Sequence, residues 1–480
     1  MRTAAPLLLA ALLWMPAPAH AALPKCGDVN DNGSINASDA LAALQRAVDD
    51  GTELDCGPRG KLLRTGQTAC FDAEGAEVSC EGSPQAGAVN RGIARSSSDN
   101  DDGTITDEVT GLVWEKLSDD GSIHDRDTLL TWEEAFDKID QLNAAELGGH
   151  DDWRLPNAFE LLTLANLGRT DPAYYAAHFA KNCEPDCSAQ ECSCVPSSND
   201  SWSSTTYVAE PDRAWLVSAA DGRLFSDEKS ALHTVRAVRG GYIVESTGSA
   251  AGAEQAQDAG SPCGDVDLSH TVTASDALAI LKAAVGQEIE LRCSPRAETL
   301  QTGQTECYDS GGAQVPCAGT GQDGELRMGA PRAFRDNGDG TITDLATGLM
   351  WEKLADDGTI HDMDNAYTWA DAFADKIIQL NTTMFAGYDN WRLPNIFELV
   401  TLLDLGSADT ALHAIFSAKS CDDGCSVTMC SCAPSHPEQW SSSTYAAAPA
   451  MAWAMHLDDG ATVPQAKSET AAVRAVRAGN

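Results

Sequence analysis

Apolar side chains recur at helical spacing in two stretches of the chain's first half. From Trp132 to Leu142 they fall on every third or fourth position, which is the period of a helix with one buried face: Trp132, Ala135, Phe136, Ile139 and Leu142. A second helix is predicted from Phe159 to Leu167. From Trp202 to Gly241 apolar and polar residues alternate in short runs, and this alternation is typical of strands.

The same pattern occurs twice along the chain. The pentapeptide Trp-Arg-Leu-Pro-Asn occupies residues 153–157 and returns at 391–395. Other motifs return in the same order: Gly-Leu-x-Trp-Glu-Lys at 111–116 and 348–353, Trp-Ser-Ser at 202–204 and 440–442, and Val-Arg-Ala-Val-Arg at 235–239 and 473–477. We therefore predict two copies of one domain, the first copy at 60–243 and the second copy at 296–480. Any function ascribed to one copy must be asked of the other.

Each copy opens with predicted hairpins. Cys70 and Cys80 flank a Glu-Gly turn, and Thr302 opens the same feature in the second copy. Residues 336–344 predict a tight turn that leads into a strand, and 102–107 keep most of that motif. The carboxylates of this turn also suggest a calcium loop, but their spacing matches none, so the turn is favoured.

A small module precedes each copy, at residues 22–59 and 263–295. The first module holds a loop with oxygen-bearing side chains at the ligand positions of an EF-hand: Asp28, Asn30, Asn32, Ser34, Asn36 and Asp39. Gly33 stands where such a loop turns sharply. The spacing predicts a Ca²⁺ ion in this loop.

The second module holds a weaker version of the loop: Asp265, Asp267, Ser269, Thr271, Thr273 and Asp276. His270 replaces the turn glycine, and a positive φ at a non-glycine residue costs stability. A helix is predicted after the first loop, because Leu41, Leu44 and Val48 fall on one face. The alternative for both modules is a metal-free helical cap held by a disulfide.

Residues 1–21 are typical of a secretory signal. Arg2 gives a positive start, an apolar run follows, and Ala19-His20-Ala21 is a small-x-small cleavage site. We therefore expect an exported protein, secreted or held at the cell surface or in the periplasm of a bacterium. No later stretch approaches the apolar length of a membrane span. Residues 244–262 are rich in Ser, Gly, Ala and Gln and predict a flexible linker.

The 16 cysteines fall at matching spacings in the two halves, and an even number in an exported chain predicts disulfides. We predict Cys26–Cys56 and Cys70–Cys80, with the next four paired among themselves in an undetermined order. Zinc is the alternative for each later group of four, because thiolates also bind Zn²⁺. The residues are Cys26, Cys56, Cys70, Cys80, Cys183, Cys187, Cys192, Cys194, Cys263, Cys293, Cys307, Cys317, Cys421, Cys425, Cys430 and Cys432.

The net charge of the chain limits which molecules it can be expected to bind. The chain has 72 acidic and 32 basic residues and a net charge of −40. Nucleic acid requires a basic face, and no Lys/Arg run supplies one. The acidity suits divalent cations, although a merely solvated acidic surface is the alternative.

Two family resemblances follow from these motifs. The first calcium loop ends in Asp and opens with Gly-Asp-Val-Asn, and it resembles a dockerin-type repeat. A dockerin carries two such loops in tandem, whereas each module here has one. The repeated motifs, from Asp-Gly-Thr-Ile-Thr-Asp to Val-Arg-x-Val-Arg, resemble the Lcl C-terminal domain family, a bacterial extracellular module named for a collagen-like adhesin.

The second resemblance implies the fold class. It implies a compact α+β domain akin to the C-type-lectin-like and formylglycine-generating folds. The chain should then contain two tandem lectin-like α+β domains, each preceded by a small helical calcium-loop module. The family's named member recognises glycosaminoglycans. The acidity of this chain fits a neutral glycan, a protein partner or a calcium-bridged acidic surface better.

One loop places a histidine beside carboxylates in both copies and is the candidate ligand-binding loop: Asp120, His124 and Asp125, then Asp357, His361 and Asp362. The alternative is an exposed polar loop without a ligand. Arg154 and Glu160 are predicted to form a buried ion pair at the start of a helix. Trp202 and Trp215 could stack on sugar rings, but the alternation around them favours the core.

We find no nucleophile elbow, phosphate-binding loop or zinc-protease helix in the sequence. Three hypotheses remain. The first is an exported, non-enzymatic binding or adhesion protein, whose ligand is an extracellular glycan or protein and whose calcium modules act as spacers. The second is an assembly component that docks another extracellular protein through its dockerin-like modules. The third is an extracellular enzyme, either polysaccharide-degrading or of the formylglycine-generating type, which needs a reactive cysteine.

Overall fold

The chain divides into two units. One comprises residues 1–57 and 261–293, and the other comprises residues 58–260 and 294–480. The two small modules therefore belong to one unit and the two copies to the other. The computed structural model describes residues 37–48, 62–175, 183–196, 200–240, 273–285, 287, 299–408, 410–417, 421 and 423–478.

Among the described residues of the first unit, two helices, α1 (Ala37–Val48) and α5 (Ala274–Ala284), pack against each other. The helix predicted after the first loop is present, but its buried face differs from the prediction. Ala40 and Ala43 are buried, whereas 57% of Leu41 and 42% of Leu44 are exposed. Small side chains at the contact let two helix axes approach closely, which explains why the alanines face inward.

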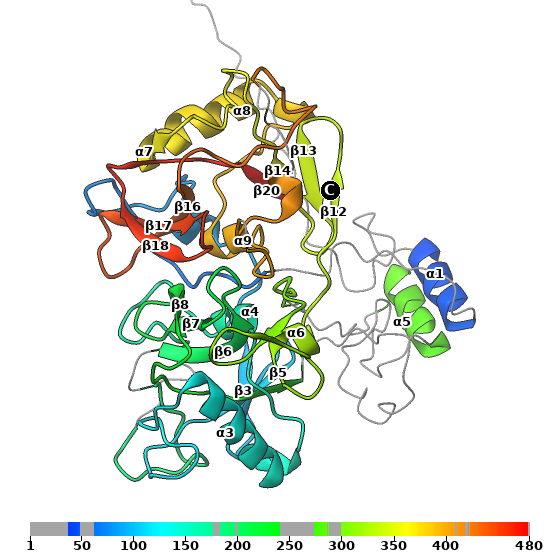
Figure 1. Cartoon of the computed structure of the whole chain (residues 1–480). Coiled ribbons are helices and arrows are strands. Elements are labelled where there is room, and N and C mark those ends of the chain that lie inside the picture. Colours follow the sequence, from blue (N-terminus) through cyan, green and yellow to red (C-terminus); the bar gives the residue numbers. More distant parts are fainter. Residues whose placement is uncertain are drawn as a thin grey trace, which may run out of the picture. The chain divides into compact units, whose positions relative to one another are not determined.

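Two antiparallel sheets form the framework of the first copy (Figure 1). The strand order of the four-stranded sheet is β3-β4-β5-β9, and that of the three-stranded sheet is β6-β7-β8. The bounds are β3 Ser97–Asp99, β4 Thr104–Asp107, β5 Leu112–Glu115, β6 Asp200–Thr206, β7 Arg213–Ser218, β8 Leu224–Glu228 and β9 Val238–Gly240. β9 is the last strand of the first copy and pairs with β5, so this sheet joins the two ends of the copy.

The second copy repeats this framework, with strand orders β12-β13-β14-β20 and β16-β17-β18. The predicted turn at 336–344 connects β12 to β13, as expected. The bounds are β12 Phe334–Asp336, β13 Thr341–Asp344, β14 Leu349–Glu352, β16 Glu438–Thr444, β17 Met451–His456, β18 Thr462–Ala466 and β20 Val476–Ala478. A further short pair, β15 (Tyr367–Thr368) and β19 (Thr470–Ala471), occurs in this copy.

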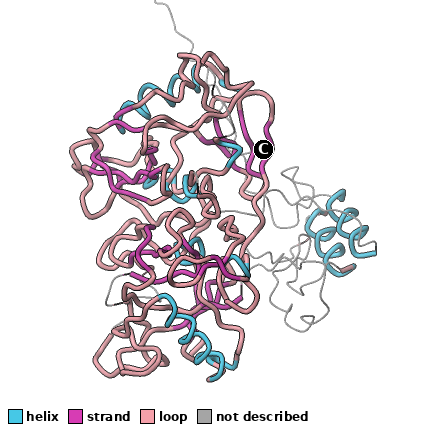
Figure 2. The backbone as a smooth tube through the Cα atoms, viewed as in Figure 1, coloured by secondary structure: helices cyan, strands magenta, loops and turns pink. Residues whose placement is uncertain are grey.

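Helices occupy the positions that the apolar spacing predicts. In the first copy they are α3 (Trp132–Ala144), the 3₁₀ turn η1 (Leu147–Gly149) and α4 (Ala158–Leu162). In the second copy the long helix runs through α7 (Trp369–Asp371), the π-helical segment η3 (Ala372–Ile377) and α8 (Ile378–Thr382). The turns η4 (Phe385–Gly387) and η5 (Ala414–Phe416) and the helix α9 (Ile396–Val400) complete it. Loops connect most elements (Figure 2), and the prediction of an α+β fold is confirmed.

The Trp-Arg-Leu-Pro-Asn motif of the first copy forms the start of α4. Asn157 and Glu160 form a reciprocal capping box. The Arg154 guanidinium donates to both carboxylate oxygens of Glu160, at 2.6 and 2.7 Å, so the predicted buried ion pair is present. The helix ends at Leu162 and not at Leu167. The apolar residues beyond it remain buried in turns, which apolar spacing alone cannot distinguish from a helix.

The tryptophans lie in the core. Trp202 and Trp215 are 0% and 2% exposed, and Trp440 and Trp453 are 0% and 1% exposed. Their rings are therefore unavailable for stacking on a sugar. No helix among the described residues is long and apolar enough to cross a membrane.

The two copies exchange their N-terminal hairpins. The first hairpin pairs β1 (Cys70–Phe71) with β2 (Glu77–Val78), and the second pairs β10 (Cys307–Tyr308) with β11 (Gln314–Val315). Lys467 of the second copy donates to the Asp72 carbonyl at 2.9 Å, and Lys229 of the first donates to the Asp309 carbonyl at 3.0 Å. Each hairpin is thus held by the opposite copy.

Short helices after the hairpins follow the same exchange. The helix α2 (Ala86–Val89) contacts β16 of the second copy, and α6 (Asp323–Leu326) contacts β6 of the first, beside which it is drawn in Figure 1. The side chain of Gln304 bridges to the backbone of Thr206, with two hydrogen bonds of 2.9 Å. The copies therefore form one interlocked body, and not two domains connected only through a linker.

Candidate functional site

An acidic loop follows the central strand of each copy, at residues 118–127 and 355–364. In the first copy the Ser118 N–H donates to the His124 carbonyl at 2.9 Å, and the Arg126 N–H returns to the Ser118 carbonyl at 3.0 Å. The second copy repeats these bonds between Ala355, His361 and Met363. Backbone hydrogen bonds therefore fix the loop in the same closed form twice.

Three carboxylates converge on this loop. One oxygen from each of Asp119, Asp125 and Asp127 lies within 4.8 Å of the other two. Asp125 is 8% exposed and accepts hydrogen bonds from the N–H groups of Gly121, at 2.6 Å, and Asp127, at 2.8 Å. The trio recurs as Asp356, Asp362 and Asp364.

The trio suits a hard divalent cation. All three groups supply oxygen, and Ca²⁺ takes oxygen ligands at about 2.3–2.6 Å. Oxygens on opposite sides of such an ion lie up to about 5 Å apart, so the spacing of the trio fits. Further ligands would have to come from solvent or from the bound molecule.

The two loops differ in charge. In the first copy Arg126 lies 3.6 Å from Asp119 and offsets part of the negative charge. In the second copy Met363 takes the place of that arginine. Burial raises the pKa of Asp356, and the carboxylates of Asp423 and Asp362 raise it further. The second loop is therefore the more electronegative of the two.

Behind each loop, a buried glutamate holds the histidine. His124 Nδ1 lies 2.8 Å from Glu115, and Lys138 lies 3.0 Å from the same carboxylate oxygen. The other oxygen of Glu115 accepts from the Ala237 N–H at 2.9 Å. His361, Lys376 and Glu352 repeat the arrangement, with distances of 2.7 and 2.5 Å.

At these two glutamates, attraction to neighbouring cations lowers the pKa by more than burial raises it. Burial alone would raise the pKa of Glu115, but attraction to Lys138 and His124 lowers it to about 2. The pKa of Glu352 is lowered to about 2 by Lys376 and His361 in the same way. Each carboxylate thus stays charged and fixes the orientation of its histidine.

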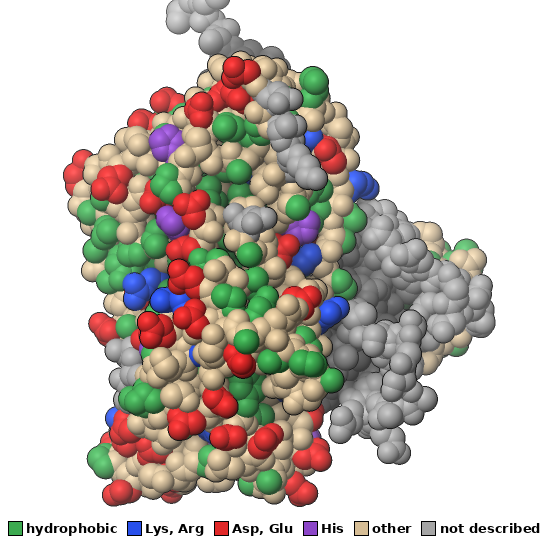
Figure 3. Space-filling view, viewed as in Figure 1, with side chains coloured by type: hydrophobic (Ala, Val, Ile, Leu, Met, Phe, Trp, Pro, Cys, Tyr) green, Lys and Arg blue, Asp and Glu red, His purple; other side chains and the backbone are tan. Residues whose placement is uncertain are grey.

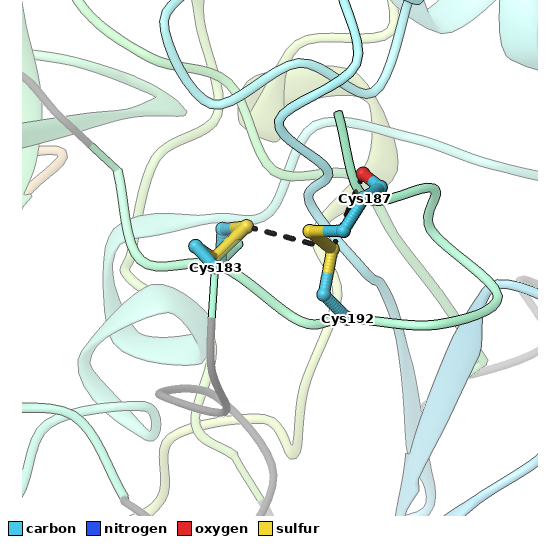
Figure 4. A group of neighbouring side chains, drawn as sticks. Cys183, Cys187 and Cys192 are labelled. Atoms are coloured by element: carbon cyan, nitrogen blue, oxygen red, sulfur yellow. Dashed lines mark hydrogen bonds between the residues drawn. A yellow bond between two sulfur atoms is a disulfide. The ribbon is translucent and has the colours of Figure 1, made fainter. Parts of the chain in front are cut away.

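Two disulfides, which together form a disulfide knot, adjoin each acidic loop. Cys183 pairs with Cys194. Cys187 pairs with Cys192, and both are labelled in Figure 4 beside Cys183. The Asp119 N–H donates to the Cys187 carbonyl at 3.0 Å, so the loop is joined directly to this knot. The second copy forms Cys421–Cys432 and Cys425–Cys430. These pairings resolve the order that the sequence left open and use the thiols that a zinc site would need.

The other described cysteines are also paired. The predicted Cys70–Cys80 disulfide is present, and Cys307–Cys317 matches it. None of the described cysteines is free, so these residues offer no reactive thiol for chemistry of the formylglycine-generating type. The predicted Cys26–Cys56 pair, Cys263 and Cys293 lie outside the described residues.

The candidate residues from the sequence are only partly brought together. Asp125 and Asp362 belong to the trios. His124 and His361 turn instead toward the buried glutamates. Asp120 accepts from the Ser118 hydroxyl, at 2.7 Å, and from the Ser122 N–H. Its equivalent Asp357 accepts from the Thr359 N–H at 3.0 Å.

Sequence reasoning missed the outer members of both trios, Asp119 and Asp127 in the first copy and Asp356 and Asp364 in the second. The signal was a cluster of four aspartates within nine residues around the histidine in both copies. Of the calcium-loop residues in the small modules, Asp39 lies buried in α1 and Thr273 directly precedes α5. Asp276 lies within α5, and the remaining ligands lie outside the described residues.

The architecture and the paired sites define a class: an α+β domain, braced by disulfides, that is built twice and carries one acidic loop per copy. The family model of the Lcl C-terminal domain matches residues 103–239 and 340–477. The chain belongs to this family, with two tandem copies of its domain. No curated protein matches the chain.

Proposed function

We propose that the chain is an exported, non-enzymatic binding protein that recognises an extracellular glycan or protein through its two acidic loops. The observation that supports this most is the repetition. The same trio of carboxylates, the same histidine and glutamate behind it and the same disulfide knot beneath it are built in both copies.

Calcium would give an acidic surface a means to bind a neutral or acidic ligand. Figure 3 shows acidic side chains spread over the visible face, with few basic ones between them. An ion held by Asp119, Asp125 and Asp127 would keep open coordination positions. Sugar hydroxyls or a partner's carboxylate could then complete the shell. Two loops held in one body would raise the strength of weak single contacts.

The test is a glycan array with the mature protein, run once with calcium and once with a chelator. We expect binding with calcium and its loss with chelator. Neutralising both loops, with Asp119→Asn and Asp127→Asn in the first copy and Asp356→Asn and Asp364→Asn in the second, should abolish it. Asp101→Asn is the matched control, because Asp101 is exposed and its φ of 60° suits asparagine.

The outcomes separate the parts of the proposal. Binding that survives in the loop variant would contradict the assignment to the acidic loops. Binding that is indifferent to chelator would contradict the role of calcium. An array without any bound glycan would exclude the glycan form and leave a protein ligand.

A second function, docking of another extracellular protein, is favoured by the helical unit. α1 and α5 pack together although they lie far apart in sequence, so the two single-loop modules meet in one unit, as a tandem pair of loops would. Leu41, Leu44, Leu278 and Leu281 are 41–57% exposed. We propose that these exposed leucines bind an apolar surface of a partner protein.

A further inference from the structure

A small apolar cleft lies where the two copies meet. Phe159 and Leu162 of α4 line one side, and Phe397 and Val400 of α9 line the other. These four residues occupy equivalent positions in the two copies, so the cleft exists only because the copies pack together. Its cavity volume is about 70 Å³.

Arg95 is the charged side chain in this lining. Its Nη1 donates to the Ala165 carbonyl at 2.5 Å, but Nε and Nη2 are buried without a hydrogen-bond partner. Among the described residues, no carboxylate lies within ion-pair distance of Arg95. Burial lowers the pKa of Arg95 to about 10, so the group is still charged at neutral pH. A buried guanidinium without an anion is costly.

The equivalent arginine of the second copy forms one more hydrogen bond than Arg95, although its Nε is also buried without a hydrogen-bond partner. Arg332 donates from Nη1 to the Leu403 carbonyl and from Nη2 to the Thr401 carbonyl. Arg95 forms only the first of these two bonds, to Ala165. The difference leaves Nη2 of Arg95 available for another acceptor beside the cleft.

We propose that the cleft binds a small carboxylate with a short apolar tail. The carboxylate would accept from Nε and Nη2 of Arg95, which match it as a two-pronged donor. The rings of Tyr175 and Phe397 lie 4.8 and 5.7 Å from the guanidinium carbon and cover it.

The size of the cleft limits the tail. An engineered apolar cavity of roughly 150 Å³ admits benzene, so this cleft has room for a shorter chain of about three or four carbons and excludes long acyl chains. The apolar part would lie between Phe159 and Phe397, in contact with both copies. This site is separate from the acidic loops, and its test does not depend on the proposed function.

The test uses the full mature chain and butanoate as the probe, with binding followed by ligand-observed NMR titration. We expect butanoate to bind at least tenfold more tightly than butan-1-ol, which has a similar tail and no charge. Butylammonium should not compete. Arg95→Gln should remove the advantage of butanoate, whereas Arg332→Gln should retain it, because Arg332 does not line the cleft and its Nη1 and Nη2 are both bonded to carbonyls.

A second variant distinguishes loss of the binding site from loss of folding. Phe159→Trp fills the cleft and keeps Arg95, so it should abolish binding of both butanoate and butanol without removing the charge. The proposal is overturned if the wild-type chain does not bind butanoate, if Arg95→Gln binds it as tightly as the wild type, or if butylammonium competes equally well.

Discussion

Glu115 and Glu352 show how single residues tie the acidic loop to the core. Each is fully buried at the end of a central strand and joins a lysine, a histidine and a backbone N–H. Removing one partner of such a network leaves a buried charge without compensation, which costs about 3–5 kcal/mol. The charge of the glutamate therefore stabilises both the loop and the fold.

The lowered pKa of Glu115 has a consequence for acid stability. The folded pKa is about 2, whereas an unfolded glutamate has a pKa of about 4.3. The contribution of the charge is therefore present above about pH 4.3 and is lost as the pH falls toward 2. Glu115→Gln should lower the free energy of unfolding by about 3–5 kcal/mol at pH 7. That deficit should shrink below about pH 4.3.

Urea denaturation at pH 7, 4 and 2.5 measures this difference. Glu108→Gln is the control, because Glu108 is an exposed glutamate in the same copy. A deficit of Glu115→Gln that is the same at all three pH values would contradict the network as described.

At the scale of elements, the packing of α1 against α5 decides which side chains of these helices are buried and which are exposed to solvent. The alanines and Ile280 face inward, and the leucines of both helices face outward. The sequence analysis had placed Leu41 and Leu44 on one apolar face of the predicted helix, and the structure leaves both exposed. We propose that a partner protein covers these exposed leucines, since large exposed apolar side chains can mark interaction sites.

Substitutions on the two faces should separate docking from stability. Leu41→Ser with Leu278→Ser should change the free energy of unfolding by no more than about 0.5 kcal/mol. The double variant should reduce the calcium-dependent capture of an extracellular protein from culture medium at least tenfold. Ile280→Ala, on the buried face, should instead cost about 2–5 kcal/mol. Equal capture by the wild type and the leucine variant would remove the docking function.

At the scale of the molecule, the exchanged hairpins make the two copies one body. Lys467 and Lys229 each hold the opposite hairpin, above the rings of Trp369 and Trp132, at 4.0 and 3.9 Å from the ring centroids. These contacts connect the copies independently of the chain between them. The orientation of the two acidic loops is then fixed by packing and not by the linker.

Cutting the linker tests this interlocking. A protease site inserted within 244–262 should yield two fragments that stay together in native mass spectrometry at micromolar concentration. Ile280→Ala, which weakens only the helical unit, should not release them. Lys229→Ala with Gln304→Ala should weaken the association, because each residue forms hydrogen bonds between the copies: Lys229 to Asp309 of the exchanged hairpin, and Gln304 to Thr206 of the first copy. Fragments that separate without denaturant would contradict the exchange.

The sequence by itself determined the features that depend on neighbouring residues. Helical spacing located α3, the predicted ion pair of Arg154 with Glu160 marked the start of α4, and the cysteines around a Glu-Gly turn predicted the Cys70–Cys80 hairpin. The recurring motifs established two copies and their family. Such signals act over a few residues, where backbone geometry leaves few alternatives.

Only the tertiary structure decided what lies far apart in sequence. The carboxylate trio depends on the closed form of the loop, and the pairing of the last cysteines depends on which of them it brings together. The exchange of hairpins could not be read from the sequence, because the receiving surfaces of two similar copies carry the same residues: Lys229 and Lys467 hold equivalent carbonyls. A hairpin bound to its own copy would therefore leave the same pattern, and only packing distinguishes the two arrangements.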